Sequence, residues 1–485
     1  MGWLNDRGRK DDMKGLIRVL DGAQMERVHG AGLELLATAG VKVENEGLLQ
    51  RLEARGAKVD WPKQRAAIPR ELAQELLGPE PGKGSLDWTI PPQEPGVGFG
   101  VGGVQPLYYD WRTGRRMRGT RALLTEVVRG AHGLPRCRSI GAPITMSDVP
   151  ERVEPVEAVA LLMSHTDRPS GIEVLHHENV KHMVALGEIF SGKPRDTRFV
   201  ASCNFAVAPL IIGRRAAGCV VEKTRFGITG VGGTMPVSGA TAPVTRAGTM
   251  AIEIAELVAF WALHRLLDPA LPLGGIVCSG SLDMRTGRAF FGSPEAIVQD
   301  CGVVQTLQHF YGIRTHIAAS YMDGKAPGIQ TAFNKVFKAL ASGMFTHNFG
   351  MNYGLLDAGK VWSPVQMLLD LDMVDTIRAL FRKLDVSDET LALDLTREVA
   401  RGEHRTFIDS DHTAAHFRQH LFHAVLLDPL NWQGDAAEQG RDRELLERAD
   451  QTWRDALRDS PRFELAAEKR RAVQDVLRRA REEQL

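Results

Sequence analysis

Short apolar runs and longer helical runs alternate eight times along the middle of this chain, and this pattern limits the possible folds more than any other feature. The runs predicted as strands cover 97–104, 139–145, 171–175, 199–205, 229–237, 274–279, 315–320 and 345–351. The predicted helices that follow them cover 120–133, 155–165, 180–189, 214–225, 247–267, 294–311, 328–342 and 364–384. Repeated strand–helix units imply a parallel sheet. Eight units over about 290 residues have the size of a (β/α)8 TIM barrel.

The first unit leaves an alternative open. Residues 108–117 also read as a hairpin around the turn at 110–114, so the first strand can lie elsewhere. A doubly wound open sheet is the competing architecture, because it is built from the same strand–helix units.

The segments that flank the barrel differ from it in pattern. Up to about residue 95 the chain reads as helical, with amphipathic segments at 25–36 and 70–77, a short strand at 41–43 and a Pro- and Gly-rich linker at 78–95. Beyond about residue 385 it is helical and charged. We therefore expect an N-terminal helical extension (1–95), a barrel catalytic domain (96–385) and C-terminal helices (386–485) that pack on the barrel or on a partner subunit.

Charge and cysteine content exclude several classes of protein. The 60 Lys and Arg residues balance 60 Asp and Glu residues, whereas nucleic-acid and anionic-membrane surfaces need a basic excess. No apolar stretch is long enough to span a bilayer, and no signal peptide is visible. Five cysteines without paired spacing do not form a disulfide framework, which favours a cytoplasmic location.

Polar side chains follow most of the predicted strands. Barrel enzymes place their chemistry at these carboxyl ends and in the loops beyond them. Any single one of these residues is readily explained as a turn or helix cap, but together they predict a site. They are Thr145, Ser147, Asp148, His176, His177, Glu178, Asn204, Ser279, Ser281, Asp283, Ser320, Tyr321, Asp323, Lys325, His347, Asn348, Asn352 and Tyr353.

Three familiar motifs fail on their context. The glycines at 98–103 match a dinucleotide fingerprint in letters, but Pro106 and the apolar run after it leave no helix N-terminus for a phosphate. His177 and His182 lie five residues apart, on different helix faces, so they do not form a zincin pair. No cysteine has the spacing of a thiolate zinc site. We therefore expect no metal bound by this chain.

Three histidines at 412, 416 and 420 share one face of a predicted helix. An i, i+4 pair of this kind can chelate a metal, so that possibility stays open. The structural explanation is that Asp411 or Ser410 caps the helix while His416 packs against the barrel.

Several longer motifs resemble the trimethylamine methyltransferase family. They are GATAPVTRAG at 239–248, DMRTG at 283–287 followed by GSPE at 292–295, and FIDSDHTAAHFR at 407–418. The resemblance extends to the helix around His29, to GVKV at 40–43 and to IPR at 68–70, and so covers about residues 20–430.

This resemblance implies a (β/α)8 barrel that moves a methyl group from a methylated amine to the cobalt of a corrinoid on a separate protein. Members that act on trimethylamine carry pyrrolysine, and this sequence has none. The resemblance then implies a quaternary-amine donor such as glycine betaine, another betaine or carnitine. The alternatives are another methylamine donor, a non-catalytic betaine-binding homologue, and a barrel enzyme that forms a Schiff base at Lys325. A homo-oligomer is also expected.

A quaternary ammonium is held by aromatic faces and by acidic or carbonyl groups. We expect Tyr321, Tyr353, Phe205 and Phe349 to form the aromatic cage and Asp323 to provide the charge. A betaine's carboxylate would be bound by His347, Asn204, Lys325 or His176. Ser238, Gly239, Thr241 and Ser281 are expected to contact the corrinoid. The 49 glycines, concentrated at 96–103, 227–248 and 274–292, are expected to make room for it.

Overall fold

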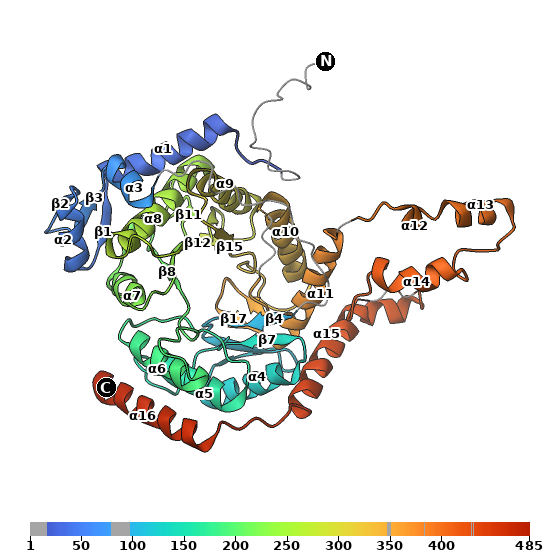
Figure 1. Ribbon diagram of the computed structural model, residues 1–485. Coiled ribbons are helices and arrows are strands. Elements are labelled where there is room, and N and C mark those ends of the chain that lie inside the picture. Colours follow the sequence, from blue (N-terminus) through green and yellow to red (C-terminus); the bar gives the residue numbers. More distant parts are fainter. Residues whose placement is uncertain (1–16, 79–97, 347–350, 383, 428, 430) are drawn as a thin grey trace, which may run out of the picture.

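A computed structural model describes residues 17–78, 98–346, 351–382, 384–427, 429 and 431–485. Parallel strands form a ring inside a ring of helices (Figure 1). Strands β8 (Cys203–Phe205), β10 (Gly230–Thr234), β12 (Leu273–Val277) and β15 (Thr315–Ile317) make one parallel sheet. Strand β4 (Phe99–Val101) pairs in parallel with β7 (Cys137–Ile140).

Two isolated parallel bridges complete the described part of the ring. Ile140 pairs with Pro169, and Ile172 pairs with Val200, so residues 169–172 occupy the third strand position between β7 and the segment leading into β8. The strand order along the chain and around the ring is the same, which confirms the predicted barrel over an open sheet.

Within the described residues, eight barrel helices form close to the predicted ranges. They are α4 (Arg121–Gly133), α5 (Glu154–His165), α6 (Asn179–Ser191), α7 (Arg214–Arg225), α8 (Arg246–Leu267), α9 (Pro294–Tyr311), α10 (Ile329–Thr346) and α11 (Pro364–Leu380). The side chains of Thr120, Ser293 and Ser363 cap α4, α9 and α11. The first two residues of the predicted eighth strand, Phe345 and Thr346, belong to the end of α10, and residues 347–350 lie outside the described residues.

Small sheets are inserted in the loops at the carboxyl ends of the strands. The predicted hairpin forms as β5 (Leu107–Asp110) and β6 (Arg115–Arg118), and β4 is present as a separate strand. It extends to β17 (Val361–Trp362) and β16 (Leu355–Leu356). A second sheet contains β11 (Val237–Ser238), β13 (Gly280–Asp283) and β14 (Arg288–Phe290).

The N-terminal segment forms the strand predicted at 41–43, but it also contains two strands that were not predicted, so it is less helical than expected. Besides α1 (Gly22–Thr38), α2 (Glu46–Ala54) and α3 (Arg70–Leu77), it contains β1 (Val41–Val43), β2 (Lys58–Asp60) and β3 (Arg65–Ala67). These strands join β9 (Ile211–Ile212) of the barrel loop in a four-stranded sheet. Neither Lys58–Asp60 nor Arg65–Ala67 has the two flanking valines that mark β1, so their sequences show no alternation that would predict a strand.

The C-terminal helices divide into two groups (Figure 1). Helices α15 (Asp435–Arg458) and α16 (Ala467–Gln484) pack on α4, α11, α5 and α6 around the outside of the barrel. Helices α12 (Asp388–Leu391), α13 (Leu393–Arg401) and α14 (Asp411–His420) form an arm that projects from the end of α11. Within the described residues, no helix has the length and apolar character to cross a membrane.

Candidate functional site in the barrel lumen

Strand alternation separates the residues that face the helices from those that face the barrel lumen. A Cβ atom added to Gly232 would meet Phe260 of α8, and one added to Gly275 would meet Trp261 of α8, so these positions face outward. A Cβ atom added to Gly233 would instead meet the ring of Phe205 on the neighbouring strand. Gly233 and Phe205 therefore face the lumen, as do the residues in register with them.

Two hydrogen-bonded rows of lumen residues follow from the registers. The upper row contains Phe205, Gly233, Ile276 and His316. The row below it contains Cys203, Val231 and Gly274.

The lumen between these rows is accessible to solvent. Barrel interiors of this fold are usually filled by layers of bulky side chains. Here Gly233 and Gly274 contribute no side chain, Cys203 and Phe205 are only half-buried, and His316 is exposed. The glycine excess thus opens the lumen itself, a use that the sequence analysis did not foresee.

Glu173 contributes a carboxylate to this lumen. It lies between Ile172 and Val174, whose side chains are buried in the core that packs against the helices, so alternation turns Glu173 inward. Burial raises the pKa of Glu173, and the positive charge of Lys223 opposes that rise only in part. The negative charge of Glu173 in turn helps raise the pKa values of the Cys203 thiol and the Tyr321 phenol. These three groups therefore act on one another inside the barrel.

Glu173 was not among the predicted site residues because it lies within a predicted strand and not at a strand end. A carboxylate in the middle of the apolar run at 171–175 was the available signal, since burying such a group without a partner costs free energy. His316 was missed for the same reason: it lies inside the predicted strand at 315–320.

Tyr321 follows the seventh strand and is held on three sides. Its ring lies edge-on to Phe291 with the centroids 5.2 Å apart. Its hydroxyl end approaches Gly359, where φ is +77° and an added Cβ would come within 2.5 Å of the phenol oxygen. Its backbone oxygen accepts a hydrogen bond from the buried Lys338 Nζ at 3.1 Å. Desolvation raises the pKa of Tyr321 to about 12, so the phenol stays neutral.

Asp323 and Lys325 lie just beyond Tyr321 in different surroundings. Asp323 Oδ2 accepts a hydrogen bond from the Gly292 amide at 3.0 Å, and burial raises the pKa of this carboxyl. Lys325 Nζ lies 2.5 Å from Asp357 Oδ1, and Asp357 Oδ2 pairs with Arg116 of β6 at 2.7 Å. Lys325 is thus part of a charge cluster that ties the seventh-strand loop to the β5–β6 hairpin.

Three predicted site residues face other surroundings. Asn204 faces α7, where its Oδ1 accepts a hydrogen bond from Lys223 Nζ at 3.2 Å. Tyr353 is 5% exposed and packs edge-on to Phe99, which belongs to the core between strand and helices. His176 Nε2 lies 3.3 Å from Glu151 Oε1. Residues 347 and 349 lie outside the described residues, so the structure gives no position for His347 or Phe349.

The four residues predicted to contact a corrinoid differ in their exposure to solvent. Ser238 is buried and its hydroxyl bonds Thr249 Oγ1 at 2.8 Å and Gln299 Oε1 at 3.0 Å. Ser281 Oγ bonds Ser293 Oγ at 2.7 Å. Gly239, with φ of +84°, and Thr241 lie on the exposed turn after β11. Only this turn offers its surface to another molecule.

A buried polar cluster lies behind the carboxyl ends of strands six and seven. Asp300 Oδ1 accepts a hydrogen bond from the Ser279 amide at 2.7 Å, and Asp300 Oδ2 lies 3.8 Å from Lys338 Nζ. Glu253 of α8 is fully buried, and its pKa is raised well above the ordinary value by desolvation and by the charge of Asp300. The negative charge of Asp300 therefore disfavours ionisation of Glu253, and Lys338 holds the backbone of Tyr321 through its carbonyl.

The three arm histidines form a ladder on α14. The ring centroids of His412 and His416 are 4.5 Å apart, and His416 Nε2 lies 3.2 Å from Glu389 Oε1 of α12. Ser410 caps the helix as expected, but His416 contacts the arm and not the barrel. Among the described residues, no cluster of three or more His, Cys, Asp or Glu side chains has the placement to hold a metal ion.

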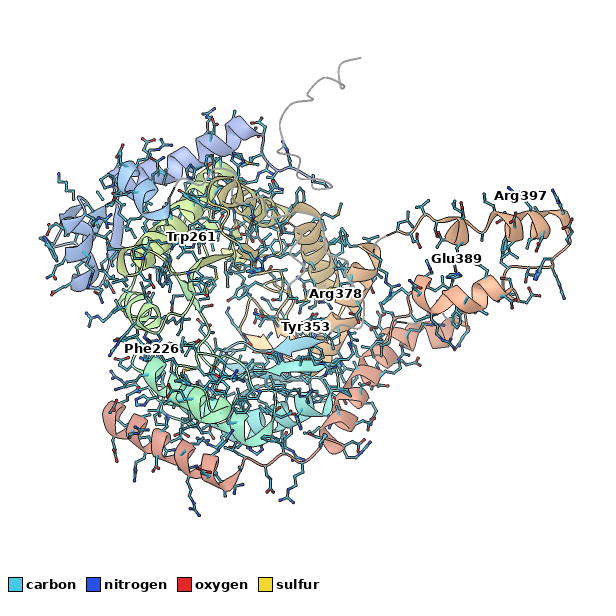
Figure 2. The ribbon with its side chains drawn as sticks, viewed as in Figure 1. Phe226, Trp261, Tyr353, Arg378, Glu389 and Arg397 are labelled. Carbon is cyan, nitrogen blue, oxygen red and sulfur yellow. The ribbon has the colours of Figure 1, made fainter. Side chains whose placement is uncertain are left out.

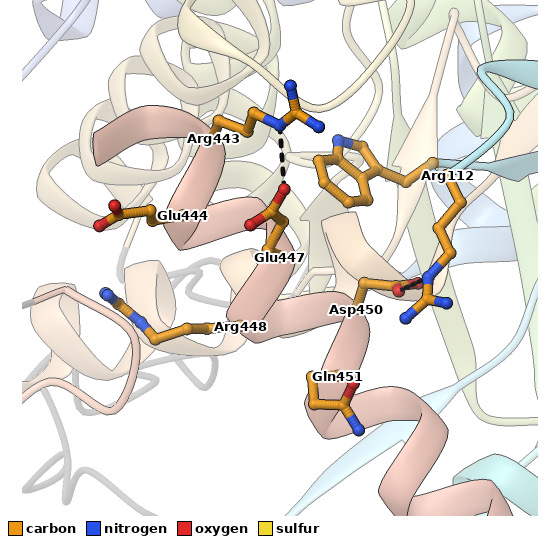
Figure 3. A pocket seen from close by; sticks show the side chains of 8 residues that line it. Arg112, Arg443, Glu444, Glu447, Arg448, Asp450 and Gln451 are labelled. Carbon is orange, nitrogen blue, oxygen red and sulfur yellow. Dashed lines mark hydrogen bonds and ion pairs between the residues drawn. The ribbon is translucent and has the colours of Figure 1, made fainter. Parts of the chain in front are cut away.

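A surface cleft of about 970 Å³ lies between the β5–β6 hairpin and α15 (Figure 3). Its charged groups already pair with one another: Arg112 Nε lies 2.5 Å from Asp450 Oδ2, and Arg443 Nε lies 2.9 Å from Glu447 Oε1. The cleft is on the outside of the barrel, so we place the candidate site in the lumen. The residues lining the cleft are Trp111, Arg112, Arg443, Glu444, Glu447, Arg448, Asp450 and Gln451.

Comparison with known proteins gives this lumen a family context. The chain is 26% identical to the trimethylamine methyltransferase MttB of Desulfitobacterium hafniense over 81% of each chain. It is 22% identical to a glycine betaine methyltransferase of the same species, over 90% of this chain and 92% of that one. The crystal structure of the hydroxylamine complex of MtmB superposes with a TM-score of 0.50 at 11% identity, over 92% of this chain and 90% of that one, and shows the same fold.

The family model for trimethylamine methyltransferase (MTTB) matches residues 11–484. A match of this extent covers the extension, the barrel and the C-terminal helices together. The chain is therefore a methyltransferase, and it belongs to the trimethylamine methyltransferase family.

Proposed function

We propose that this protein transfers a methyl group from a quaternary amine, such as glycine betaine, another betaine or carnitine, to the reduced cobalt of a corrinoid carried by a partner protein. The single observation that carries this proposal is the carboxylate of Glu173 in a solvent-accessible barrel lumen beside aromatic side chains. The 22% identical glycine betaine methyltransferase supports the choice of donor.

The charge of the lumen favours a cationic ligand. Burial raises the pKa of Glu173, and among the described residues the charge of Lys223 offsets that rise only in part. Lys223, whose charge lowers the pKa of Glu173, is directed toward the outer side of β8, where its Nζ donates to the Cys203 carbonyl and to Asn204 Oδ1, both at 3.2 Å. A quaternary ammonium between Glu173, Phe205 and Tyr321 would supply the missing positive charge and contact aromatic faces.

The lumen also suits the chemistry of methyl transfer. When the N–C bond breaks, its electron pair stays on nitrogen and the donor leaves as a neutral amine, so no general acid is required. The corrinoid's reduced cobalt supplies the electron pair of the new bond to carbon. Because the ammonium loses its charge as the reaction proceeds, displacement of water from the lumen when the donor and the corrinoid protein bind would favour the transition state. Fixing the methyl in line with the acceptor lowers the entropic barrier further.

The rim of the barrel supports a protein partner. Three successive loops each expose one large apolar side chain: Val207 is 59% exposed, Val244 73% and Met284 77%. The turn at Gly239 and Thr241 lies among them. An apolar rim around an open lumen suits a protein that presents a flat cofactor to it.

Two details refine the proposed site. His316 lies in the same lumen row as Phe205, and its imidazole suits a betaine's carboxylate. Lys325 Nζ is held by Asp357 at 2.5 Å and its side chain is half-exposed, whereas a Schiff-base lysine is activated by a desolvated pocket, which disfavours the Schiff-base alternative. All five cysteines are unpaired, which supports a cytoplasmic location.

The test combines the protein with cob(I)alamin and a panel of glycine betaine, carnitine and trimethylamine. We expect methylcobalamin to form with a betaine or carnitine, and its absorbance measures the reaction. Product from trimethylamine alone would favour the methylamine alternative. Betaine binding by calorimetry without methylation of cobalamin or of any corrinoid protein would favour the non-catalytic alternative. No binding and no product with any donor would contradict the proposal.

A further inference from the structure

Helix α10 buries its polar face and exposes its apolar face, which is the reverse of an ordinary surface helix. A helix on the wall of a soluble protein usually buries its apolar face and exposes its charged one. Helix α10 buries its polar face instead, including two lysines with no exposed surface. The buried polar residues of α10 are Thr331, Asn334, Lys335, Lys338, Ser342 and Thr346.

Buried partners fix this orientation. Lys335 Nζ lies 2.5 Å from Asp370 Oδ2 of α11. Lys338 Nζ donates to the carbonyls of Phe291 and Tyr321, each at 3.1 Å. Turning the helix to expose its lysines would break these bonds and leave Asp370 buried without its cation. The apolar face of α10 therefore points outward.

The outward face of α10 carries large apolar side chains and no charged residue. Their spacing repeats over four turns on one side of the helix. The rings of Phe333 and Phe337 stack with their centroids 6.1 Å apart. The exposed members are Ile329 (79%), Phe333 (69%), Val336 (42%), Phe337 (42%) and Met344 (37%). We call these five residues the α10 stripe.

The stripe is too large for an ordinary free surface. With aromatic side chains offering about 150–250 Å² each, the stripe exposes roughly 500 Å², near the upper end for the largest patch on a monomer. Two such stripes in contact would bury about 1,000 Å², which is the lower limit for a specific interface. The absence of charge on the stripe also means that two identical copies would not repel each other.

The arm provides a second apolar surface on the same flank. Helix α10 packs against α11, and the arm leaves from the end of α11 (Figure 1). No residue of α12, α13 or α14 is buried, and Glu389 and Arg397 lie far from the barrel (Figure 2). Leu384 (81%), Val386 (66%) and Ile408 (82%) are exposed along it. Helices of four to ten residues are marginal alone in water, so they need a surface to pack on.

We propose that the α10 stripe is the interface with a second copy of this chain, related by a twofold axis, and that the arm of each copy packs on the other. A twofold arrangement covers both apolar surfaces of both copies with one type of contact. Adding the two arms to the two stripes brings the interface well above the lower limit for stability. This proposal does not depend on the identity of the methyl donor.

The test measures the mass of the full-length protein by light scattering and sedimentation across a dilution series. We expect a dimer for the natural protein. Phe333→Glu places a charge at the centre of the stripe and is expected to weaken dimerisation by on the order of 100-fold or more. Val244→Glu is the matched control, because Val244 is about as exposed as Phe333 (73% and 69%) but lies on the barrel rim. The dissociation constant of the Val244→Glu dimer should equal that of the natural protein.

Two further measurements keep the result interpretable. Circular dichroism and the melting temperature should show that Phe333→Glu stays folded, since its side chain already faces solvent in one copy. Ile408→Glu on the arm should also weaken the dimer. A natural protein that is monomeric at every concentration, or a dimer that Phe333→Glu leaves unchanged, would overturn the proposal.

Discussion

Lys335 Nζ lies 2.5 Å from Asp370 Oδ2 between α10 and α11, and neither side chain reaches solvent. Asp370 also accepts hydrogen bonds from the Gly354 amide at 2.8 Å and from Gln366 Nε2 at 2.7 Å. The pair therefore joins two barrel helices to the segment that follows residue 350.

Replacing Lys335 with methionine should destabilise the protein by about 3–5 kcal/mol, because it leaves Asp370 buried without its cation. Urea denaturation followed by circular dichroism measures the loss. The double variant Lys335→Met with Asp370→Leu should recover part of it, since no uncompensated charge remains. An unchanged unfolding midpoint in the single variant would show that the pair does not support the fold.

Glu173→Gln should raise KM for a quaternary amine by about 10–100-fold without lowering kcat. The carboxylate attracts the cationic donor, but that attraction fades as the nitrogen becomes neutral in the transition state, so the lost binding belongs mainly to the ground state. Steady-state methylation of cob(I)alamin separates the two constants. Glu178→Gln, on the neighbouring helix cap, is the control and should leave both constants unchanged. A large fall in kcat with unchanged KM would contradict this role.

Binding of a quaternary amine should weaken as the pH falls through the raised pKa of Glu173. Protonated Glu173 carries no charge for the cation, whereas the bound cation lowers the pKa of Glu173 and releases its proton. Calorimetry in buffers with different ionisation enthalpies should detect this release in the natural protein. In Glu173→Gln the affinity should be weak and independent of pH over the same range. Equal pH profiles for both proteins would exclude Glu173 as the titrating group.

Glu253→Gln should flatten the dependence of stability on pH. The folded-state pKa of Glu253 is raised above its ordinary value of 4.5, so the folded protein holds a proton that the unfolded chain releases. The stabilisation is complete below about pH 4.5 and is lost as the pH rises through the folded-state pKa. Unfolding midpoints in urea from pH 5 to pH 9 should therefore fall in the natural protein and change less in the variant. Glu188→Gln, at the half-buried end of α6, is the control.

The sequence by itself determined the repeated strand–helix units, and the strand order in the structure distinguished the barrel from an open sheet. Eight alternating runs predict eight strand–helix units, because a parallel strand and the helix that follows it must each bury apolar side chains. This requirement shows in the apolar pattern of each segment by itself. The caps at Thr120, Ser293 and Ser363 follow from the same local chemistry. Strands β2 and β3 do not show the apolar alternation seen in β1, so the sequence does not predict them.

The site was predicted only in part. The proposed lumen site includes Tyr321 and Phe205, which the sequence singles out because a polar strand end and an aromatic residue at a strand end are visible within one segment. Glu173 and His316 were not predicted, because their significance depends on which face of a strand meets the lumen and on the glycines of the neighbouring strands.

The tertiary structure alone decided which face of each element is buried. In α10 the sequence shows an amphipathic helix, and the usual rule would bury Phe333 and expose Lys335. Asp370 on α11 and the carbonyls of Phe291 and Tyr321 reverse that rule. The physical reason is that a helix turns toward whichever neighbours satisfy its strongest groups, and those neighbours come together only when the chain has folded.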